Sequence, residues 1–251
     1  MSAEESTPAI VIRARDYSES DRIVTLLTRD FGKLSGIAKG AKASRRRFER
    51  KLEPFSHVIL SFRRRPQGQL VFITRAERGE NPPPELEDDL GKIALGSYML
   101  ELADALTTEE GEAAEAYRVL ADALDALGRG AATIALRQAY ELKMLAAAGF
   151  GLEFGSCRVC GTVAEAEEGA VYFVLSRGGI VCARCRANAP EGAVRLAPAS
   201  AAALARLGSA SFGEATVLPH GGADGALAIA RFFASILDRK LRSVEFLDSL
   251  L

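Results

Sequence analysis

Four cysteines within one short segment constrain the fold of this chain more than any other feature. They form two Cys-x-x-Cys pairs, Cys157 with Cys160 and Cys182 with Cys185, and 21 residues separate the pairs. A tight turn of this kind directs two thiolates at one point, and two such turns complete a tetrahedron around Zn²⁺. The sequence therefore predicts one structural Zn²⁺ ion, with no coordination position left open for water.

Two disulfides or a dithiol redox pair are the alternatives for these cysteines. Disulfides are disfavoured in a cytosolic chain, and a redox motif needs only one pair, which would leave the second unexplained. Residues 171–181 are rich in β-branched and aromatic side chains around Gly178 and Gly179, which predicts a hairpin between the pairs. We expect a zinc segment over residues 150–190, folded by the metal because it is too small to hold its own core.

A cytoplasmic location is an expectation drawn from what the sequence lacks. The sequence starts Met-Ser-Ala-Glu-Glu, which lacks the basic and apolar blocks of a signal peptide. No apolar run approaches the roughly 20 residues that span a bilayer. We therefore expect no membrane partner.

Residues 8–80 are predicted to form a small β domain. Segments rich in β-branched residues and separated by turn residues cover 9–15, 22–28, 34–40, 57–65 and 69–75. Five short strands fit a Greek-key barrel of the OB-fold type, although an SH3-like barrel would give the same pattern. Residues 81–84, Asn-Pro-Pro-Pro, form a stiff linker and predict a boundary between a domain at 1–80 and another at 81–251.

After the linker, apolar residues recur with helical spacing. Leu95, Met99, Leu102 and Leu106 share one face of a helix that begins near Leu86, and further helical patterns cover 117–127, 131–148, 199–207 and 227–247. We interpret these stripes as the core of an α-helical bundle that needs no cofactor. The predicted fold class is α+β and multidomain: an N-terminal OB-fold barrel, then a central and C-terminal helical bundle with the four-cysteine zinc segment inserted in it.

The net charge of −1 hides an asymmetry, because residues 1–80 carry +7 and residues 81–251 carry −8. Residues 31–75 hold 12 basic and 2 acidic side chains. Such a block predicts a surface for a polyanion, although a solvated basic surface is the alternative. The candidate DNA-binding residues are Lys33, Lys39, Lys42, Arg45, Arg46, Arg47, Phe48, Arg50 and Lys51.

Aromatic residues are interleaved with these cations, as in proteins that stack single-stranded bases over a basic groove. We expect Phe48, inside the charged loop, to stack on bases, and Phe55 and Phe62 to lie in the barrel core. No pattern for bidentate base reading is present, so we expect little sequence specificity.

No catalytic centre is predicted. We expect His57 and His220 to be structural or solvated, and the sequence lacks a phosphate-binding Gly-rich loop, a nucleophile elbow and paired metal carboxylates. Two alternatives remain open: a nucleic-acid-processing enzyme with an unrecognised activity, and a zinc-containing RNA-binding module.

Several stretches resemble the RecO family of DNA repair proteins, namely residues 16–28, 31–42 and 52–55. Gly149 and Phe150, followed by the two cysteine pairs, are similar to the zinc-bearing members. The resemblance implies an OB fold that binds single- and double-stranded DNA and anneals complementary strands. It also implies work with RecR, and sometimes RecF, to load the RecA recombinase onto gaps coated by single-stranded DNA-binding protein. A nucleoid-associated protein of the cytoplasm is therefore expected.

Overall fold

The computed structural model describes residues 3–44, 47–48, 51–65, 70–79, 86, 89–109, 111, 113–166, 169–188 and 192–251. Its contacts divide the chain into two compact units, Met1–Arg129 and Gly130–Leu251. Within the described ranges, no helix combines the length and the apolar character needed to cross a bilayer.

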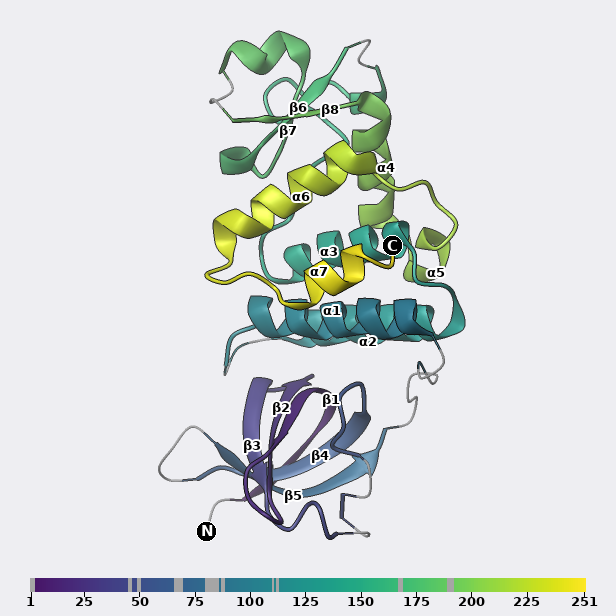
Figure 1. The fold of residues 1–251 in the computed structure, drawn as a ribbon. Coiled ribbons are helices and arrows are strands. Elements are labelled where there is room, and N and C mark those ends of the chain that lie inside the picture. The colour runs from purple at the N-terminus through teal and green to yellow at the C-terminus, as the bar shows by residue number, and fades with distance from the viewer. Residues whose placement is uncertain are drawn as a thin grey trace. The chain divides into compact units, whose positions relative to one another are not determined.

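The first unit contains a closed five-stranded barrel (Figure 1). Its strands are β1 (Glu4–Asp16), β2 (Arg22–Thr28), β3 (Gly32–Ala38), β4 (His57–Arg63) and β5 (Val71–Arg78). Around the barrel the order is β1-β2-β3-β5-β4, and β4 returns to β1. All neighbours are antiparallel except β3 and β5, which are parallel. The prediction of an OB-like barrel is confirmed.

Strand β1 begins at Glu4, five residues before the predicted strand. Residues 4–10 pair with β4, from Glu4 opposite Arg63 to Ile10 opposite His57, while residues 9–16 pair with β2. One long strand thus bridges two neighbours. Its polar first residues escaped prediction because backbone pairing at an exposed strand end needs no apolar alternation.

Of the two phenylalanines predicted for the barrel core, Phe62 lies there and Phe55 does not. Phe62 is fully buried and meets the ring of Phe31 edge to face, with centroids 5.4 Å apart. Phe55 instead lies outside the barrel, with a φ of +71°. A Cβ atom at Gly96 in the following helix would stand 2.9 Å from its ring. The expectation of a barrel-core role for Phe55 is therefore corrected, because its ring packs against a helix.

Helices α1 (Leu90–Leu106) and α2 (Ala114–Arg129) complete the first unit. Helix α1 begins at Leu90 rather than near Leu86, because the carboxylate of Asp89 accepts a hydrogen bond from the backbone N–H of Lys92 and caps the helix. Contacts place both helices with the barrel. The boundary between residues 80 and 81 and the insertion at 150–190 remain predictions.

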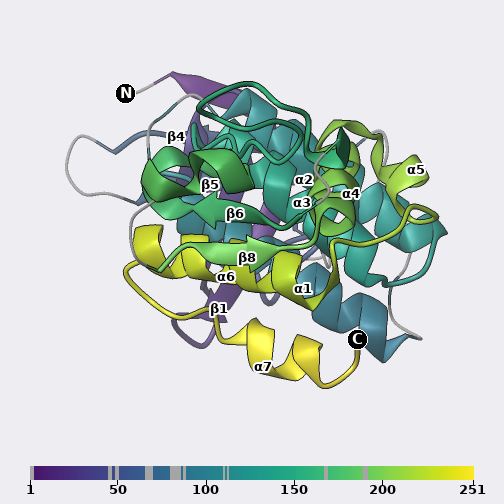
Figure 2. The same cartoon turned by 90° about the horizontal axis from the view of Figure 1, so that it is seen from above.

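The second unit combines helices with a small sheet. The helices are α3 (Ile134–Ala147), α4 (Pro198–Ser209), α5 (Phe212–Ala215), α6 (Gly222–Ile236) and α7 (Ser243–Asp248). The sheet has the order β7-β6-β8, from β6 (Val171–Val174), β7 (Gly179–Val181) and β8 (Val194–Leu196). Helix α6 runs beside β8 (Figure 2). The hairpin predicted between the cysteine pairs is present as β6 and β7.

The apolar stripe over residues 227–247 divides between two helices. Leu237 caps α6 with an extended backbone, and α7 starts at Ser243. The intervening residues are mostly charged, yet Leu241 among them stays buried. Periodicity alone could not show that the chain turns while it keeps its apolar contacts.

His57 lies at the start of β4; its side chain is half-buried, and its Nε2 atom is shielded from solvent. Among the described residues, its Nε2 atom has no hydrogen-bond partner. Burial lowers the pKa of His57 to about 4, and the charge of Asp125 in α2 opposes this shift. The position is therefore occupied by a neutral imidazole, as expected for a structural histidine.

This burial predicts a pH dependence of stability. A histidine in the unfolded chain has a pKa of about 6.5, so as pH falls the unfolded state takes up the proton first. Stability is fully present above pH 6.5 and is lost as pH falls toward 4, by up to about 3 kcal/mol. Urea unfolding at pH 7 and pH 4.5 should show a smaller loss in His57→Asn than in the native protein. His220→Asn, at an exposed position, is the control, and equal losses in all three proteins would contradict the assignment.

Candidate nucleic-acid interface and metal centre

Two loops meet at the end of the barrel where β3 finishes. They are the β1–β2 loop, residues 17–21, and the connection from β3 to β4, residues 39–56; together we call them the barrel end. The backbone N–H of Lys42 donates to the carbonyl of Ser20 (3.1 Å), and that of Gly40 donates to the carboxylate of Asp21 (2.9 Å). The Gly40 hydrogen bond holds the pKa of Asp21 below its usual value. These contacts fix the cation-bearing loop beside the β1–β2 loop, one of the loops that carry oligonucleotides in OB folds.

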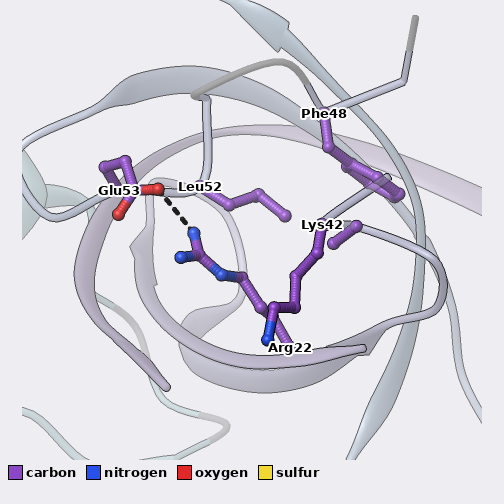
Figure 3. A pocket seen from close by; sticks show the side chains of 6 residues that line it. Arg22, Lys42, Phe48, Leu52 and Glu53 are labelled. Carbon is purple, nitrogen blue, oxygen red and sulfur yellow. Dashed lines mark hydrogen bonds and ion pairs between the residues drawn. The ribbon is translucent and has the colours of Figure 1, made fainter. Parts of the chain in front are cut away.

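A pocket of about 260 Å³ opens at the barrel end (Figure 3). It is lined by Arg22, Ala41, Lys42, Phe48, Leu52 and Glu53. The guanidinium of Arg22 bridges Asp16 (3.1 Å) and Glu53 (2.5 Å), and Lys42 Nζ lies 2.8 Å from Asp16. The hydrogen bonds from Lys42 and Arg22 lower the pKa of Asp16. Both pocket cations are thus already paired with carboxylates of the same unit.

Three of the predicted DNA-binding residues are exposed at the barrel end, namely Lys39, Lys42 and Arg47, and Lys51 is half-buried there. The guanidinium of Arg47 donates to the carbonyl of Lys39 (3.1 Å), which draws these two cations together. The carbonyl of Arg47 accepts a hydrogen bond from Ala76 of β5 (3.1 Å), so this part of the loop is held to the barrel. Arg45, Arg46 and Arg50 lie outside the described residues.

Phe48 is not placed for base stacking. Its ring is 2% exposed and belongs to the barrel core with Leu60 and Phe62. The guanidinium of Arg47 lies 5.1 Å from the ring centroid and covers it. The expectation for Phe48 is therefore corrected: the loop turns this apolar ring inward because burying it is favourable, while its charged neighbour stays in water.

Lys33 is also in a different place from the rest of the set. It is the second residue of β3, whereas Lys39 follows the end of that strand, about 20 Å away at the usual rise per residue. Its ammonium lies 3.2 Å from the buried carboxylate of Asp104 in α1 and donates to the carbonyl of the same residue (2.7 Å). Arg13 also contacts this carboxylate (3.4 Å). Lys33 therefore joins the barrel to α1, away from the other cations of the set, and its contact with DNA stays a prediction.

Sequence reasoning missed Tyr17, which lies in the β1–β2 loop. Its side chain is 64% exposed, and no other aromatic residue in the described ranges is more exposed. The backbone N–H of Tyr17 donates to the carbonyl of Asp21 (3.0 Å), so the loop that carries the ring is closed on itself. The signal was available: an aromatic residue inside the polar run of residues 16–21 has no strand face on which to be buried.

The four cysteines converge on one point of the second unit. Their sulfur atoms all lie within 4.8 Å of one another, and the Cys160 and Cys182 sulfurs are 3.6 Å apart. Sulfurs around a tetrahedral Zn²⁺ ion are roughly 3.8 Å apart, given Zn–S bonds of about 2.3 Å. The positive φ of Gly161 (+75°) closes the first turn, and the Cys157 sulfur accepts backbone hydrogen bonds from Val159 and Cys182. The donor set fits a closed structural metal site.

The protonation of the thiols also fits a cation at this point. A hydrogen bond from Thr162 lowers the pKa of Cys160 to about 6, whereas hydrogen bonding to Cys160 raises that of Cys185 to about 12. The shifts oppose each other because four crowded thiols cannot all carry a negative charge without a counter-charge. A divalent ion supplies that charge and allows all four thiolates to form.

Comparison with known proteins covers nearly the whole chain. Residues 1–80 match the family described as recombination protein O N terminal, and residues 87–245 match recombination protein O C terminal. A protein named DNA repair protein RecO from an Anaeromyxobacter species is 39% identical, covering 95% of this chain and 93% of the relative. Proteins of that name from Symbiobacterium thermophilum (33% identical, 96% and 95% covered) and Streptomyces coelicolor (32%, 95% and 96%) are also similar.

The buried ion pair of Lys33 and Asp104 generates a stability prediction. Removing one partner of a mostly buried pair leaves an uncompensated charge, so Asp104→Ala should lower the free energy of unfolding by about 3 kcal/mol. Asp122→Ala removes an exposed carboxylate paired with Arg118 and should change it little. Urea denaturation measures both variants, and equal midpoints would show that the pair does not join the barrel to α1.

Proposed function

Because the chain belongs to the RecO family of DNA repair proteins, we propose that it binds single- and double-stranded DNA at the barrel end and anneals complementary strands. One observation carries this proposal. Lys39, Lys42 and Arg47 are gathered at one end of an OB-like barrel, beside the exposed ring of Tyr17. Cations that neutralise phosphates on two strands lower the repulsion between them, so that base pairing can begin.

The proposed contact surface differs from the one predicted from sequence. It keeps Lys39, Lys42, Arg45, Arg46, Arg47, Arg50 and Lys51, and it omits Lys33 and Phe48. Tyr17 takes the stacking role, since a ring on a fixed loop offers its face to any base. Contacts to phosphates and ring faces carry no sequence information, so binding is independent of sequence.

The role that fits such a surface is that of a mediator rather than an enzyme. In the proposed pathway the protein works with RecR, and with RecF in some settings, on gaps coated by single-stranded DNA-binding protein. It helps load the RecA recombinase there, in the cytoplasm and in association with the nucleoid. The family membership supports these partners, and the barrel end supports contact with DNA. We propose no catalytic residues.

We also propose that Cys157, Cys160, Cys182 and Cys185 hold one Zn²⁺ ion with a structural role. Four thiolates leave no position for substrate or water, so the ion would stabilise the fold rather than act on DNA. The small sheet supports this proposal, because its strands have three or four residues each and its cysteine-bearing turns depend on one shared point.

The barrel-end proposal is tested by the salt dependence of DNA binding. Each phosphate contact contributes about 0.7 to the slope of log affinity against log salt for single strands. Lys39→Ala/Lys42→Ala/Arg47→Ala should reduce the magnitude of that slope by about 1.4 to 2.1. The lower value applies if Lys42 stays paired with Asp16 and contacts no phosphate. Fluorescence anisotropy with a labelled oligothymidylate, repeated over a KCl series, measures it.

The control for this experiment is Arg118→Ala/Arg129→Ala/Arg206→Ala, which removes the same charge from exposed arginines paired with carboxylates. Its slope should match that of the native protein. Tyr17→Ala separates stacking from charge: affinity should fall about 5- to 100-fold with the slope unchanged, because stacking releases no counterions. If the triple barrel-end variant keeps the native slope, the proposed DNA-binding surface is wrong.

The metal proposal is tested by composition and by acid. Purified protein should contain about one zinc per chain, and Cys160→Ser should lower that content. Lowering the pH should release the metal, since protons compete for the thiolates. Elemental analysis together with circular dichroism measures both effects, and a natively folded protein without metal would refute the proposal.

A further inference from the structure

The small sheet of the second unit has two faces with different surroundings. On one face Phe173 of β6 stacks on Phe154, with centroids 5.1 Å apart, and meets Phe232 of α6 edge to face at 6.3 Å. Alternate residues of a strand point to opposite faces, so Tyr172 and Val174 point away from these rings. That second face carries the cysteine-bearing turns.

Three arginines share this second face. Arg195 of β8 stands opposite Tyr172 in the strand register, so the two side chains are neighbours. The guanidinium of Arg186 lies over the Tyr172 ring, 4.1 Å from its centroid. Gly179 of β7 faces the same way, since it pairs with Val174, and a Cβ atom there would stand 2.9 Å from the Arg158 side chain. We call Arg158, Arg186, Arg195 and Tyr172 the arginine face.

The cysteine cluster holds the arginine face in place. Cys157 and Cys182 pack with Val174 and Val181 in a small core, and Tyr172 lies against it. Arg158 sits inside the first Cys-x-x-Cys turn, and Arg186 follows Cys185 directly. The backbone N–H of Arg158 also donates to the carbonyl of Ile180 in β7 (2.8 Å). Two of the three arginines are therefore positioned by the turns that converge on the metal site.

In the part of the chain that the structure describes, the arginine face has no carboxylate counter-charge; the nearest negative charge is that of the thiolates at the proposed metal site. No described carboxylate forms an ion pair with Arg158, Arg186 or Arg195, in contrast to Arg22 and Lys42 at the barrel end. The two described carboxylates nearest in sequence to the first cysteine pair are engaged elsewhere. Glu153 accepts backbone hydrogen bonds from Gly155 and Ser156, and Glu165 pairs with Arg206.

We propose that the arginine face is a second contact surface for the phosphate backbone of a single DNA strand. A guanidinium can donate two parallel hydrogen bonds to a phosphate, which suits arginine to this role. From Gly179 to Arg195 the face crosses two strand spacings and two residues, about 12 Å, which matches a few consecutive phosphates. The inference rests on the proposed DNA binding and adds a second contact surface, on the second unit.

The test uses the full chain with Arg158→Gln/Arg186→Gln/Arg195→Gln, which keeps most of each side chain and removes three charges. If each arginine contacts one phosphate, the magnitude of the salt slope for a labelled oligothymidylate falls by about 2. Combined with the barrel-end triple variant, the two reductions should add, because the two surfaces share no residue. Zinc content equal to that of the native protein shows that the segment is folded. Arg118→Gln/Arg129→Gln/Arg206→Gln is the matched control, with the native slope expected.

The outcomes separate this inference from the proposed function. If native protein and barrel-end variant behave as expected but the arginine-face variant keeps the native slope, the arginine face is not a DNA surface and the barrel-end proposal stands. Binding of polyglutamate is measured alongside. If the arginine-face variant loses polyglutamate binding while its DNA slope is unchanged, the face contacts an acidic protein segment rather than DNA, and the inference is overturned. Native protein that binds oligothymidylate with no salt dependence would overturn both proposals.

Discussion

Backbone pairing around the closed barrel determines where the barrel end lies. Among the described residues, strands β3 and β5 pair through Gly36 with Val71 and Ile37 with Phe72. A Cβ atom at Gly36 would stand 2.7 Å from Ile73 and 2.9 Å from Val71, so the contact requires glycine. Because Ala38 at the end of β3 pairs with Arg22 at the start of β2, the loop that follows β3 emerges beside the β1–β2 loop. The backbone hydrogen bond from Lys42 to Ser20 then holds the two loops together.

The second unit holds its loops in place by different interactions. Its small sheet has strands of three or four residues, too few to hold two loops in register by backbone pairing alone. Four sulfur atoms at one point supply what the short strands lack. The aromatic cluster of Phe154, Phe173 and Phe232 anchors the opposite face. Thiols therefore position one face of the sheet, and aromatic rings position the other.

The sequence predicted features that depend on local pattern and failed where three-dimensional placement decides. Alternating β-branched residues revealed all five barrel strands, and cysteine spacing revealed the cluster. Charge density identified a basic segment. It could not show that Lys33 and Lys39 lie at opposite ends of one strand, or that Lys33 contacts Asp104, 71 positions along the chain. The sequence could not show that Phe48 is buried while Tyr17 is exposed, because hydrophobicity does not say which ring a loop turns inward.

The carboxylates of Asp16 and Glu53 at the mouth of the barrel have a kinetic consequence. A phosphate that reaches Lys42 or Arg22 replaces a partner that stays tethered a few ångströms away. The displaced carboxylate competes at once for the same cation, so each such contact is short-lived. Short-lived contacts let a bound strand slide and change register. The proposed annealing would require that alignments between two strands be tested and the finished duplex released, and contacts of this kind meet both requirements.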